Sequence, residues 1–462
     1  MNRAEAMSCG GCHQNSNGAE IAPNVKWPPS KFFVHVDERG NLSPALTKQF
    51  LPARAALLAD YWQKTVDKTV EKWRFAEVDH SEHYNNFGGF YNTSNHPNSY
   101  AFAALKADGS IIAWGRSSHG GTSAPSGSGY TKIYSTSAAF AALKADGSIT
   151  AWGSSSDGGS GAPSGNGYIK IYSTGHAFAA LKADGSITTW GRSSHGGTGA
   201  PSGSGYTKIY PNGYAFAALK ADGSITAWGG AGGTGAPSGS GYTKIHSTLT
   251  AFAAIKDGSI TAWGGVGGAG APSDSGYTKI YSTSAAFAAL KADGSITAWG
   301  SWNEGGTGAP SDRGYVKIYS NWNTFAALKA DGSITTWGYG PFGGTGAPSG
   351  NGYTKIYSTY AAFAALKADG SITAWGDSGY GGTGAPSGNG YIKIYSNHDA
   401  FAALKANGSI TAWGSGGGTG APSGNGYIKI YSTAHAFAAV KADGSITAWG
   451  NSDSGGTTPA SD

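Results

Sequence analysis

Hydrophobic and polar positions follow one fixed pattern along most of this chain. Near-copies of the string FAALKADGSITAWG recur at intervals of 35 to 38 residues, and each ends in a Trp-Gly pair. Within each copy, large apolar residues alternate with small or polar ones over two short runs, which is typical of β-strands. A period in this range indicates a repeat architecture with one structural unit per copy. The ten copies begin at Phe102, Phe140, Phe178, Phe216, Phe252, Phe287, Phe325, Phe363, Phe401 and Phe437.

Each copy predicts three short antiparallel strands, described here for the second copy. We expect the strands at residues 130–134, 140–144 and 148–152. Residues 145–147, Ala-Asp-Gly, form the hairpin loop between the last two strands, and the glycine can adopt the left-handed conformation that such a loop needs. The shortened fifth copy, residues 256–259, lacks the alanine. There we expect a two-residue Asp-Gly turn, with the lysine still facing the serine.

The predicted register makes both faces of each sheet apolar. Phe140 lies opposite Trp152 on one face, and Leu143 lies opposite Ile149 on the other. A sheet with two apolar faces must be covered on both, so each unit is expected to pack between two neighbours. One copy buries too little surface to fold alone, and the copies therefore fold together. Radial stacking of short antiparallel sheets gives a propeller.

The repeat also resembles a known one. The string GGTGAPSGNGYIKIYSTGHAFAALKADGSITAWG resembles the repeat of the regulator of chromosome condensation family, in the short version with three-stranded blades found in a β-lactamase inhibitory protein. The resemblance covers residues 87–462 and implies a β-propeller with one motif per blade. Ten motifs exceed the roughly four to eight blades usual for propellers, so the sequence leaves a closed ring and an open spiral as alternatives. Guanine-nucleotide exchange and enzyme inhibition are the activities that family analogy implies, and we rank them below a binding role.

We therefore predict an all-β fold, a β-propeller or open spiral of about ten short three-stranded antiparallel blades over residues 87–462. Its first strand is expected near residues 90–93. A small, mostly helical or irregular segment, residues 1–86, precedes it. Within this segment Ser43-Pro44 is typical of a helix start, and residues 53–74 have the spacing of an amphipathic helix.

The copies differ mainly in two windows, one just before the Phe and one just after the Trp-Gly. In an antiparallel hairpin these two points lie side by side, so both windows fall on one rim, which we call the variable rim. The opposite rim repeats Asp-Gly-Ser. We expect an unidentified protein or surface ligand to bind the variable rim, because aromatic and arginine side chains anchor interfaces. The alternative is unconstrained drift of exposed loops. The candidate binding residues are His119, Arg192, His195, Tyr214, Trp302, Trp322, Tyr339, Phe342, Tyr360, Tyr380, His398 and His435.

Nothing in the repeat predicts catalysis. The Asp-Gly pairs lack the alternating acidic ligands of calcium loops and are interpreted as turns. No repeated carboxylate pair or Ser/His/Asp set stands out, so we expect a binding protein rather than an enzyme.

Composition changes this picture little. Only 13% of residues are charged, and the net charge of +5 spreads over the copies without a run of Lys or Arg, so we expect no nucleic-acid partner. The 77 glycines and 18 prolines are periodic and interleaved with large apolar residues, which argues against disorder. No stretch of about 18 apolar residues predicts a membrane span. The opening string MNRAEAMSCG has no apolar core of a signal peptide.

Residues 1–86 hold the only two cysteines, in Cys9-Gly-Gly-Cys12-His13. This Cys-x-x-Cys-His pattern predicts covalent haem c, in which two thiols bond the vinyl groups and the histidine ligates iron. A redox dithiol or disulfide and a partial zinc site are the alternatives.

The sequence around the motif resembles the haem-bearing tail of exported bacterial cytochrome-like proteins. The resemblance implies Cys9 and Cys12 as attachment points and His13 as proximal ligand, and His35 is our candidate for the distal ligand. It also implies an exported protein, periplasmic or extracellular. Eight residues before the motif leave little room for the usual helix, and a signal peptide is missing; both would follow if the chain is the C-terminal piece of a longer protein. The second functional hypothesis is thus an electron-transfer protein whose propeller is a spacer or dock.

Overall fold

A computed structural model of the chain describes residues 20–22, 25–26, 73–75 and 96–459. The chain divides into two compact units, Met1–Thr69 and Val70–Asp462. In the first unit, β1 (Glu20–Ala22) and β2 (Val25–Lys26) pair as an antiparallel hairpin. The second unit carries the repeats.

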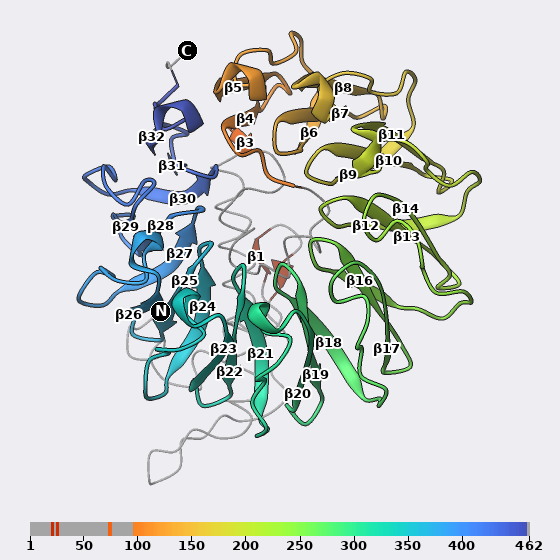
Figure 1. Cartoon of the computed structure of the whole chain (residues 1–462). Helices are drawn as coiled ribbons and strands as arrows, with labels where there is room; N and C mark the ends of the chain where they lie inside the picture. Colours follow the sequence, from red (N-terminus) through yellow and green to blue (C-terminus); the bar gives the residue numbers. More distant parts are fainter. Residues whose placement is uncertain (1–19, 23–24, 27–72, 76–95, 460–462) are drawn as a thin grey trace. The chain divides into compact units, whose positions relative to one another are not determined.

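The second unit is all-β, with ten three-stranded antiparallel sheets arranged as blades around a central axis (Figure 1). Each blade has an inner, a middle and an outer strand in chain order, so the predicted propeller of ten short blades is confirmed. The inner strands are β3 (Trp73–Phe75), β6 (Tyr130–Ser135), β9 (Tyr168–Ser173), β12 (Tyr206–Pro211), β15 (Lys244–Ser247), β18 (Tyr277–Ser282), β21 (Tyr315–Ser320), β24 (Tyr353–Ser358), β27 (Tyr391–Ser396) and β30 (Tyr427–Ser432).

The middle and outer strands form the hairpin that recurs with little change from one repeat to the next, with the turn that contains Asp-Gly, or Asn-Gly in blade 9, between them. The middle strands are β4 (Ala101–Lys106), β7 (Ala139–Lys144), β10 (Ala177–Lys182), β13 (Ala215–Lys220), β16 (Ala251–Lys256), β19 (Ala286–Lys291), β22 (Thr324–Lys329), β25 (Ala362–Lys367), β28 (Ala400–Lys405) and β31 (Ala436–Lys441). The outer strands are β5 (Ile111–Gly115), β8 (Ile149–Gly153), β11 (Ile187–Gly191), β14 (Ile225–Gly229), β17 (Ser259–Gly264), β20 (Ile296–Gly300), β23 (Ile334–Gly338), β26 (Ile372–Gly376), β29 (Ile410–Gly414) and β32 (Ile446–Gly450).

Short 3-10 helices follow the outer strand in seven blades. They are η2 (Ser117–His119), η3 (Ser155–Asp157), η4 (Ser193–His195), η5 (Trp302–Glu304), η6 (Gly340–Phe342), η7 (Ser378–Tyr380) and η8 (Ser452–Ser454). Each ends at a glycine with positive φ.

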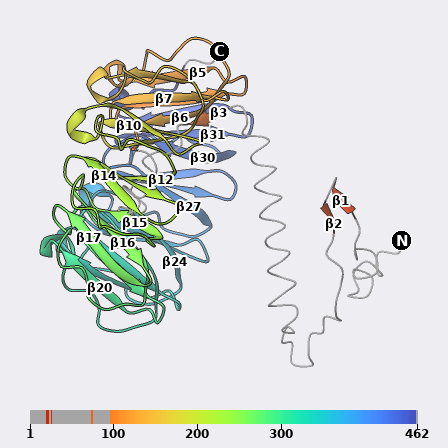
Figure 2. The ribbon, with the colours of Figure 1, turned by 90° about the vertical axis from the view of Figure 1, so that its right-hand side faces the viewer.

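The predicted register is confirmed. Phe140 pairs with Trp152, and their rings stack with centroids 5.2 Å apart, while Leu143 pairs with Ile149. The two faces pack against different neighbours, as expected. Phe140 and Trp152 lie in a core with residues of blade 1, whereas Leu143 lies in a core with Ile171 and other residues of blade 3. Figure 2 shows the blades of the second unit edge-on, stacked face to face.

The ring is closed, and the open spiral is excluded. The last blade contributes Tyr431 and Val440 to one core cluster with Phe102 and Trp114 of the first blade. The indole of Trp114 donates to the carbonyl of Gly455, at 3.2 Å. The same bond joins every pair of neighbouring blades. The other donors are Trp152, Trp190, Trp228, Trp263, Trp299, Trp337, Trp375, Trp413 and Trp449.

The first strand of blade 1 differs from the prediction. It is β3, paired with β4 through Trp73 opposite Lys106 and Phe75 opposite Ala104, and not a segment near residues 90–93, which lie outside the described residues. Residues 73–75 thus lie in the second unit, Val70–Asp462, although the sequence analysis assigned them to the segment before the propeller. The helix expected over 53–74 cannot reach its predicted end, because residues 73–75 are strand; residues 53–72 lie outside the described part.

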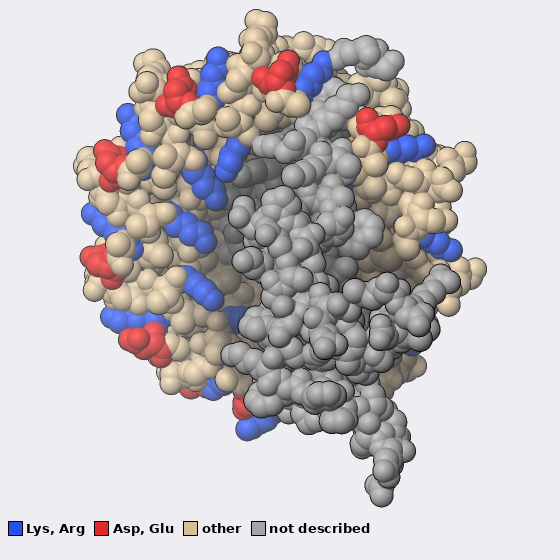
Figure 3. All heavy atoms as spheres, turned by 180° about the vertical axis from the view of Figure 1, so that it is seen from behind, with Lys and Arg blue, Asp and Glu red and all other residues tan. Residues whose placement is uncertain are grey.

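The inner strands give the ring a basic lining. Each inner strand of blades 2 to 10 carries one lysine, and no inner strand carries an acidic residue. Figure 3 shows Lys or Arg side chains on the inner side of the ring, and pairs of acidic and basic side chains around its perimeter. The lysines are Lys132, Lys170, Lys208, Lys244, Lys279, Lys317, Lys355, Lys393 and Lys429.

Candidate partner-binding rim

A repeated threonine or asparagine joins the two variable windows of each blade. In blade 2, the hydroxyl of Thr136 accepts a hydrogen bond from the amide of Ala139 and donates to the carbonyl of Asp157, each at 3.0 Å. The first contact holds the window before the Phe, and the second holds the window after the Trp-Gly. Both windows therefore lie on one rim, as predicted. The equivalent donors are Asn98, Thr174, Asn212, Thr248, Thr283, Asn321, Thr359, Asn397 and Thr433.

Backbone hydrogen bonds also run from blade to blade along this rim. The amide of Trp322 donates to the carbonyl of Tyr360, that of Tyr360 to His398, and that of His398 to Ala434. The amide of Ala434 donates to the carbonyl of Ser99 at 3.1 Å, which carries the chain of bonds from the last blade to the first. The variable side chains are thus mounted on a hydrogen-bonded frame.

Six of the predicted residues form one contiguous group, which we call the aromatic cluster. Tyr360 lies at its centre, with ring centroids 5.0 Å from Trp322, 5.6 Å from Phe342 and 4.5 Å from His398. Its members come from blades 7, 8 and 9. They are Trp322, Tyr339, Phe342, Tyr360, Tyr380 and His398.

Ring contacts continue from the aromatic cluster across blade 10 to blade 1. His398 lies 5.6 Å from His435, which lies 5.8 Å from Tyr100. Tyr100 contacts His119 at 4.8 Å, and the guanidinium of Arg116 lies 4.1 Å above the tyrosine ring. The rings therefore form a continuous band along the rim from blade 7 through blade 10 to blade 1.

A second group, the Asp157 cluster, lies over blades 2 to 4. The carboxylate of Asp157 contacts Nδ1 of His176 at 2.6 Å and Nη2 of Arg192 at 3.0 Å. His176 packs edge-on to His195, whose ring lies 4.7 Å from that of Tyr214. The cluster joins three of the predicted residues to two acid–base partners.

Hydrogen bonding and burial set the charges of the Asp157 cluster. Burial alone would raise the pKa of Asp157, but hydrogen bonds from Ser154, His176 and Ser156 hold that pKa below its usual value. Burial, together with the charges of His176 and Arg192, lowers the pKa of His195 to about 4. At neutral pH, Asp157 is therefore ionised and His195 is neutral.

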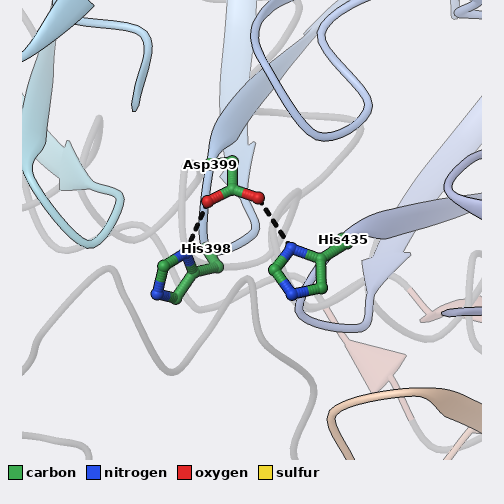
Figure 4. Close-up of side chains that lie close together, drawn as sticks. All are labelled: His398, Asp399 and His435. Carbon is green, nitrogen blue, oxygen red and sulfur yellow. Dashed lines mark hydrogen bonds and ion pairs between the residues drawn. The ribbon is translucent and has the colours of Figure 1, made fainter. Parts of the chain in front are cut away.

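Asp399 is the second acid held by histidines on the rim. Its carboxylate lies between His398 and His435, and Figure 4 shows both imidazoles turned toward it. Burial would raise the pKa of Asp399, but the hydrogen bonds from these two rings keep it well below the usual range. One ligand atom from each of the three residues lies within 4.8 Å of the others.

The predicted rim residues differ in how far they reach into solvent. Trp302 is 71% exposed and Tyr339 is 41% exposed, whereas His195 is 8% exposed and supports its neighbours from below. The sequence prediction missed Tyr100, Asp157, His176 and Asp399. All four lie in the two variable windows, where the copies differ, so the sequence did contain a signal for them. The prediction selected other aromatic, histidine and arginine residues of these windows and passed over the two acids as well as Tyr100 and His176.

The haem prediction falls on Cys9, Cys12, His13 and His35, which lie outside the described residues. In the described part of the chain, no helix is long and apolar enough to cross a membrane.

Comparisons with known proteins give structural likeness only. The chain matches no protein-family model and no curated protein. Among solved structures it is similar to the ectodomain of the receptor kinase CR4 from Physcomitrella patens, with 17% identity over 52% of this chain and 69% of that chain, at a TM-score of 0.34. It is also similar to the CRINKLY WD40 ectodomain of the Arabidopsis thaliana receptor kinase ACR4, with 18% identity over 53% of this chain and 93% of that one, at 0.34.

A third similar structure is Prp20p from Saccharomyces cerevisiae, described with its binding to Gsp1p and histones. It shares 18% identity over 54% of this chain and 72% of its own, at a TM-score of 0.32. Another structure of this yeast protein calls it RCC1 and contains bound Kap60. Likenesses at this level carry no conclusion about this chain. Its fold, a closed ten-bladed propeller of three-stranded blades, is established by its own blades.

Proposed function

We propose that this propeller is a binding scaffold that takes a partner protein on its variable rim, and that it is not a catalyst. The observation that carries the proposal is the aromatic cluster, whose rings pack on one another across neighbouring blades. Aromatic side chains dominate the energetics of interfaces, and they lose little conformational entropy when they are already packed. The frame of Thr and Asn hydrogen bonds supports the same interpretation, because it fixes the loops and leaves their side chains free to vary.

The exposed members of the rim indicate where contact would be made. Trp302 and Tyr339 offer large apolar surfaces to solvent. Tyr339 belongs to the aromatic cluster, in which Trp322 packs on Tyr360. Contiguous apolar side chains at a surface, rather than single ones, are typical of an interaction site, and Tyr339 is continuous with the packed rings of the aromatic cluster.

Affinity capture with three forms of the chain tests the proposal. The rim variant carries Trp302→Ala, Trp322→Ala and Tyr339→Ala. The control carries Ile392→Thr, which removes another exposed apolar side chain, 57% exposed on an inner strand, at a position where other blades have threonine. We expect proteins captured by both the wild type and the control to be lost from the rim variant, by more than tenfold. Equal capture by all three forms would overturn the proposal.

We propose a second function for residues 1–86, covalent binding of haem c. The observation behind it is the sequence Cys9-Gly-Gly-Cys12-His13, with His35 as the candidate distal ligand. The proposal includes export, because haem attachment follows it in bacteria. Expression with a signal peptide and the maturation machinery should give a c-type pyridine haemochrome band, absent from the Cys9→Ser/Cys12→Ser variant. A wild-type chain without that band would rule out haem and electron transfer together.

A further inference from the structure

Asp399 sits between two imidazoles from neighbouring blades. Nδ1 of His398 lies 2.5 Å from one carboxylate oxygen, and Nδ1 of His435 lies 2.6 Å from the other (Figure 4). His398 comes from the loop between β27 and β28, and His435 comes from the loop between β30 and β31. Neither loop could assemble the group alone, so the site exists only where blades 9 and 10 meet.

The backbone holds this group in place. The side chain of Asn397 accepts from the amides of Asp399 and Ala400, at 2.8 and 2.7 Å, and donates to the carbonyl of Gly416. Gly416 leaves room for this carboxylate, because a Cβ at position 416 would lie 2.6 Å from Oδ2 of Asp399. Tyr360 stacks on the ring of His398. Such support fixes ligand geometry before a ligand arrives.

The charge of the group favours a cation. The Asp399 side chain is 17% exposed, and the two histidine side chains are 27% and 30% exposed. In the described part of the chain, the ion-pair contacts of this partly desolvated carboxylate are to the two imidazoles and not to a Lys or Arg side chain. In the Asp157 cluster, by contrast, one imidazole is joined by Arg192, whose guanidinium already neutralises the carboxylate. The chain thus holds two comparable carboxylate–imidazole groups: Asp157 pairs with an arginine, whereas Asp399 contacts only imidazoles among its ion-pair partners in the described residues.

We propose that His398, Asp399 and His435 bind a divalent transition-metal ion of the Zn²⁺ class. Two histidines and one carboxylate form a recurrent ligand set that leaves further positions to water. A neutral imidazole can move its proton from Nδ1 to Nε2, which exposes the Nδ1 lone pair without net loss of a proton. The ion then takes the place of the hydrogen bonds that now join the three side chains.

Metal titration of the full chain tests this inference. The chain carries Cys9→Ser and Cys12→Ser and no histidine tag, so that neither the thiols nor the tag compete for the ion. Isothermal titration with ZnCl₂ is compared among this background, His435→Ala, Asp399→Asn and the matched control His176→Ala. We expect the background and the control to share one class of sites that is weakened more than tenfold in the other two.

A second measurement covers variants that fold poorly. Co²⁺ gives a visible absorption band when bound by nitrogen and oxygen ligands, and a bound ion raises the melting temperature. Both effects should appear in the background and in His176→Ala and should be absent from Asp399→Asn, which keeps the shape of the side chain. Identical Zn²⁺ isotherms and Co²⁺ spectra for the background and His435→Ala would overturn the site. Failure of the metal-site proposal would leave the partner-binding proposal standing, because affinity capture tests partner binding separately.

Discussion

Single residues in this protein can be judged by what their counterparts do in other blades. The inner-strand tyrosine is one such position. Tyr319 and Tyr357 are buried and hydrogen-bond to the backbone of Ile356 and Ile394 in the next blade, and burial raises their pKa values to about 12. In blade 5 the position holds His246, whose two ring nitrogens are buried without a hydrogen-bond partner among the described residues. A buried polar atom without a partner costs stability.

Changing His246→Tyr should therefore stabilise the protein, by about 1–3 kcal/mol. Burial and the charges of Lys244 and Lys208 lower the pKa of His246 from 6.5 to about 4. Between these two values the unfolded chain takes up a proton that the folded chain does not, so the wild type loses stability as pH falls from 6.5 to about 4. Urea denaturation at several pH values should show the advantage of the variant growing over that range. A constant difference would contradict the assignment, and Tyr319→His should show the opposite change.

At the scale of the element, the hairpin of a blade tolerates a change in length. The side chain that ties the two variable windows of a blade together, in contrast, is always that of Thr or Asn. The fifth hairpin is shorter by one residue, yet Lys256 still pairs with Ser259, as predicted. Asp257 and Gly258 both have positive φ, 51° and 75°, which is the geometry of a two-residue turn. Every described blade, by contrast, keeps Thr or Asn at the position that ties its two windows.

Changing Thr174→Val should destabilise the protein by about 1–3 kcal/mol, because it leaves a buried amide and a buried carbonyl without their partner. The lost contacts are those to the amide of Ala177 and the carbonyl of His195, at 3.0 and 3.1 Å. Thr174→Asn should restore stability, since Asn397 makes the same two kinds of bond.

The matched control for this change is Thr207→Val, which also removes a threonine hydroxyl and its bond to the carbonyl of Leu219, at 3.1 Å, but at an exposed inner-strand position where Ile169 and Val316 occur in other blades. Chemical denaturation of Thr174→Val, Thr174→Asn and Thr207→Val compares their free energies of unfolding. Equal stability of Thr174→Val and the control would show that the tie contributes no more than a hydrogen bond at an exposed position.

At the scale of the whole molecule, the ring has no terminal blade. The bond from Trp114 to Gly455 joins residues from opposite ends of the repeats, yet it has the same 3.2 Å length as the internal bond from Trp228 to Gly196. Gly455 also has the positive φ of its counterparts, and a Cβ there would lie 2.7 Å from the ring of Phe102. Blade 10 therefore packs on blade 1 as any blade packs on the next.

Trp114→Phe and Trp228→Phe should thus destabilise the protein equally, each by about 1–3 kcal/mol, because each removes an indole donor and leaves a glycine carbonyl without a partner. In an open spiral Trp114 would belong to a terminal blade, and its loss would cost much less. Thermal and chemical denaturation of the two variants compare them directly. A clearly smaller effect at Trp114 would contradict closure.

The sequence anticipated most of this fold from particular residues. The spacing of Phe140, Leu143 and Trp152 was enough to place strands, turns and both packed faces, because these contacts lie within one hairpin. It also placed both variable windows on one rim. It misplaced the first inner strand, because residues 76–100 separate β3 from β4, whereas residues 136–138 are enough in blade 2. Trp73, Arg74 and Phe75 fit the end of a helical pattern as well as a strand, and only pairing with β4 distinguishes the two.

What the sequence determined by itself is therefore the repeat: ten blades, their register and the rim on which they vary. Those features depend on contacts within a hairpin, where chain distance is short and the alternation of side chains sets the pairing. Closure of the ring, the band of aromatic rings and the Asp399 group were decided by the tertiary structure alone. Each depends on side chains from different blades, and which of them meet follows from the small rotation between neighbouring blades, added up around the ring.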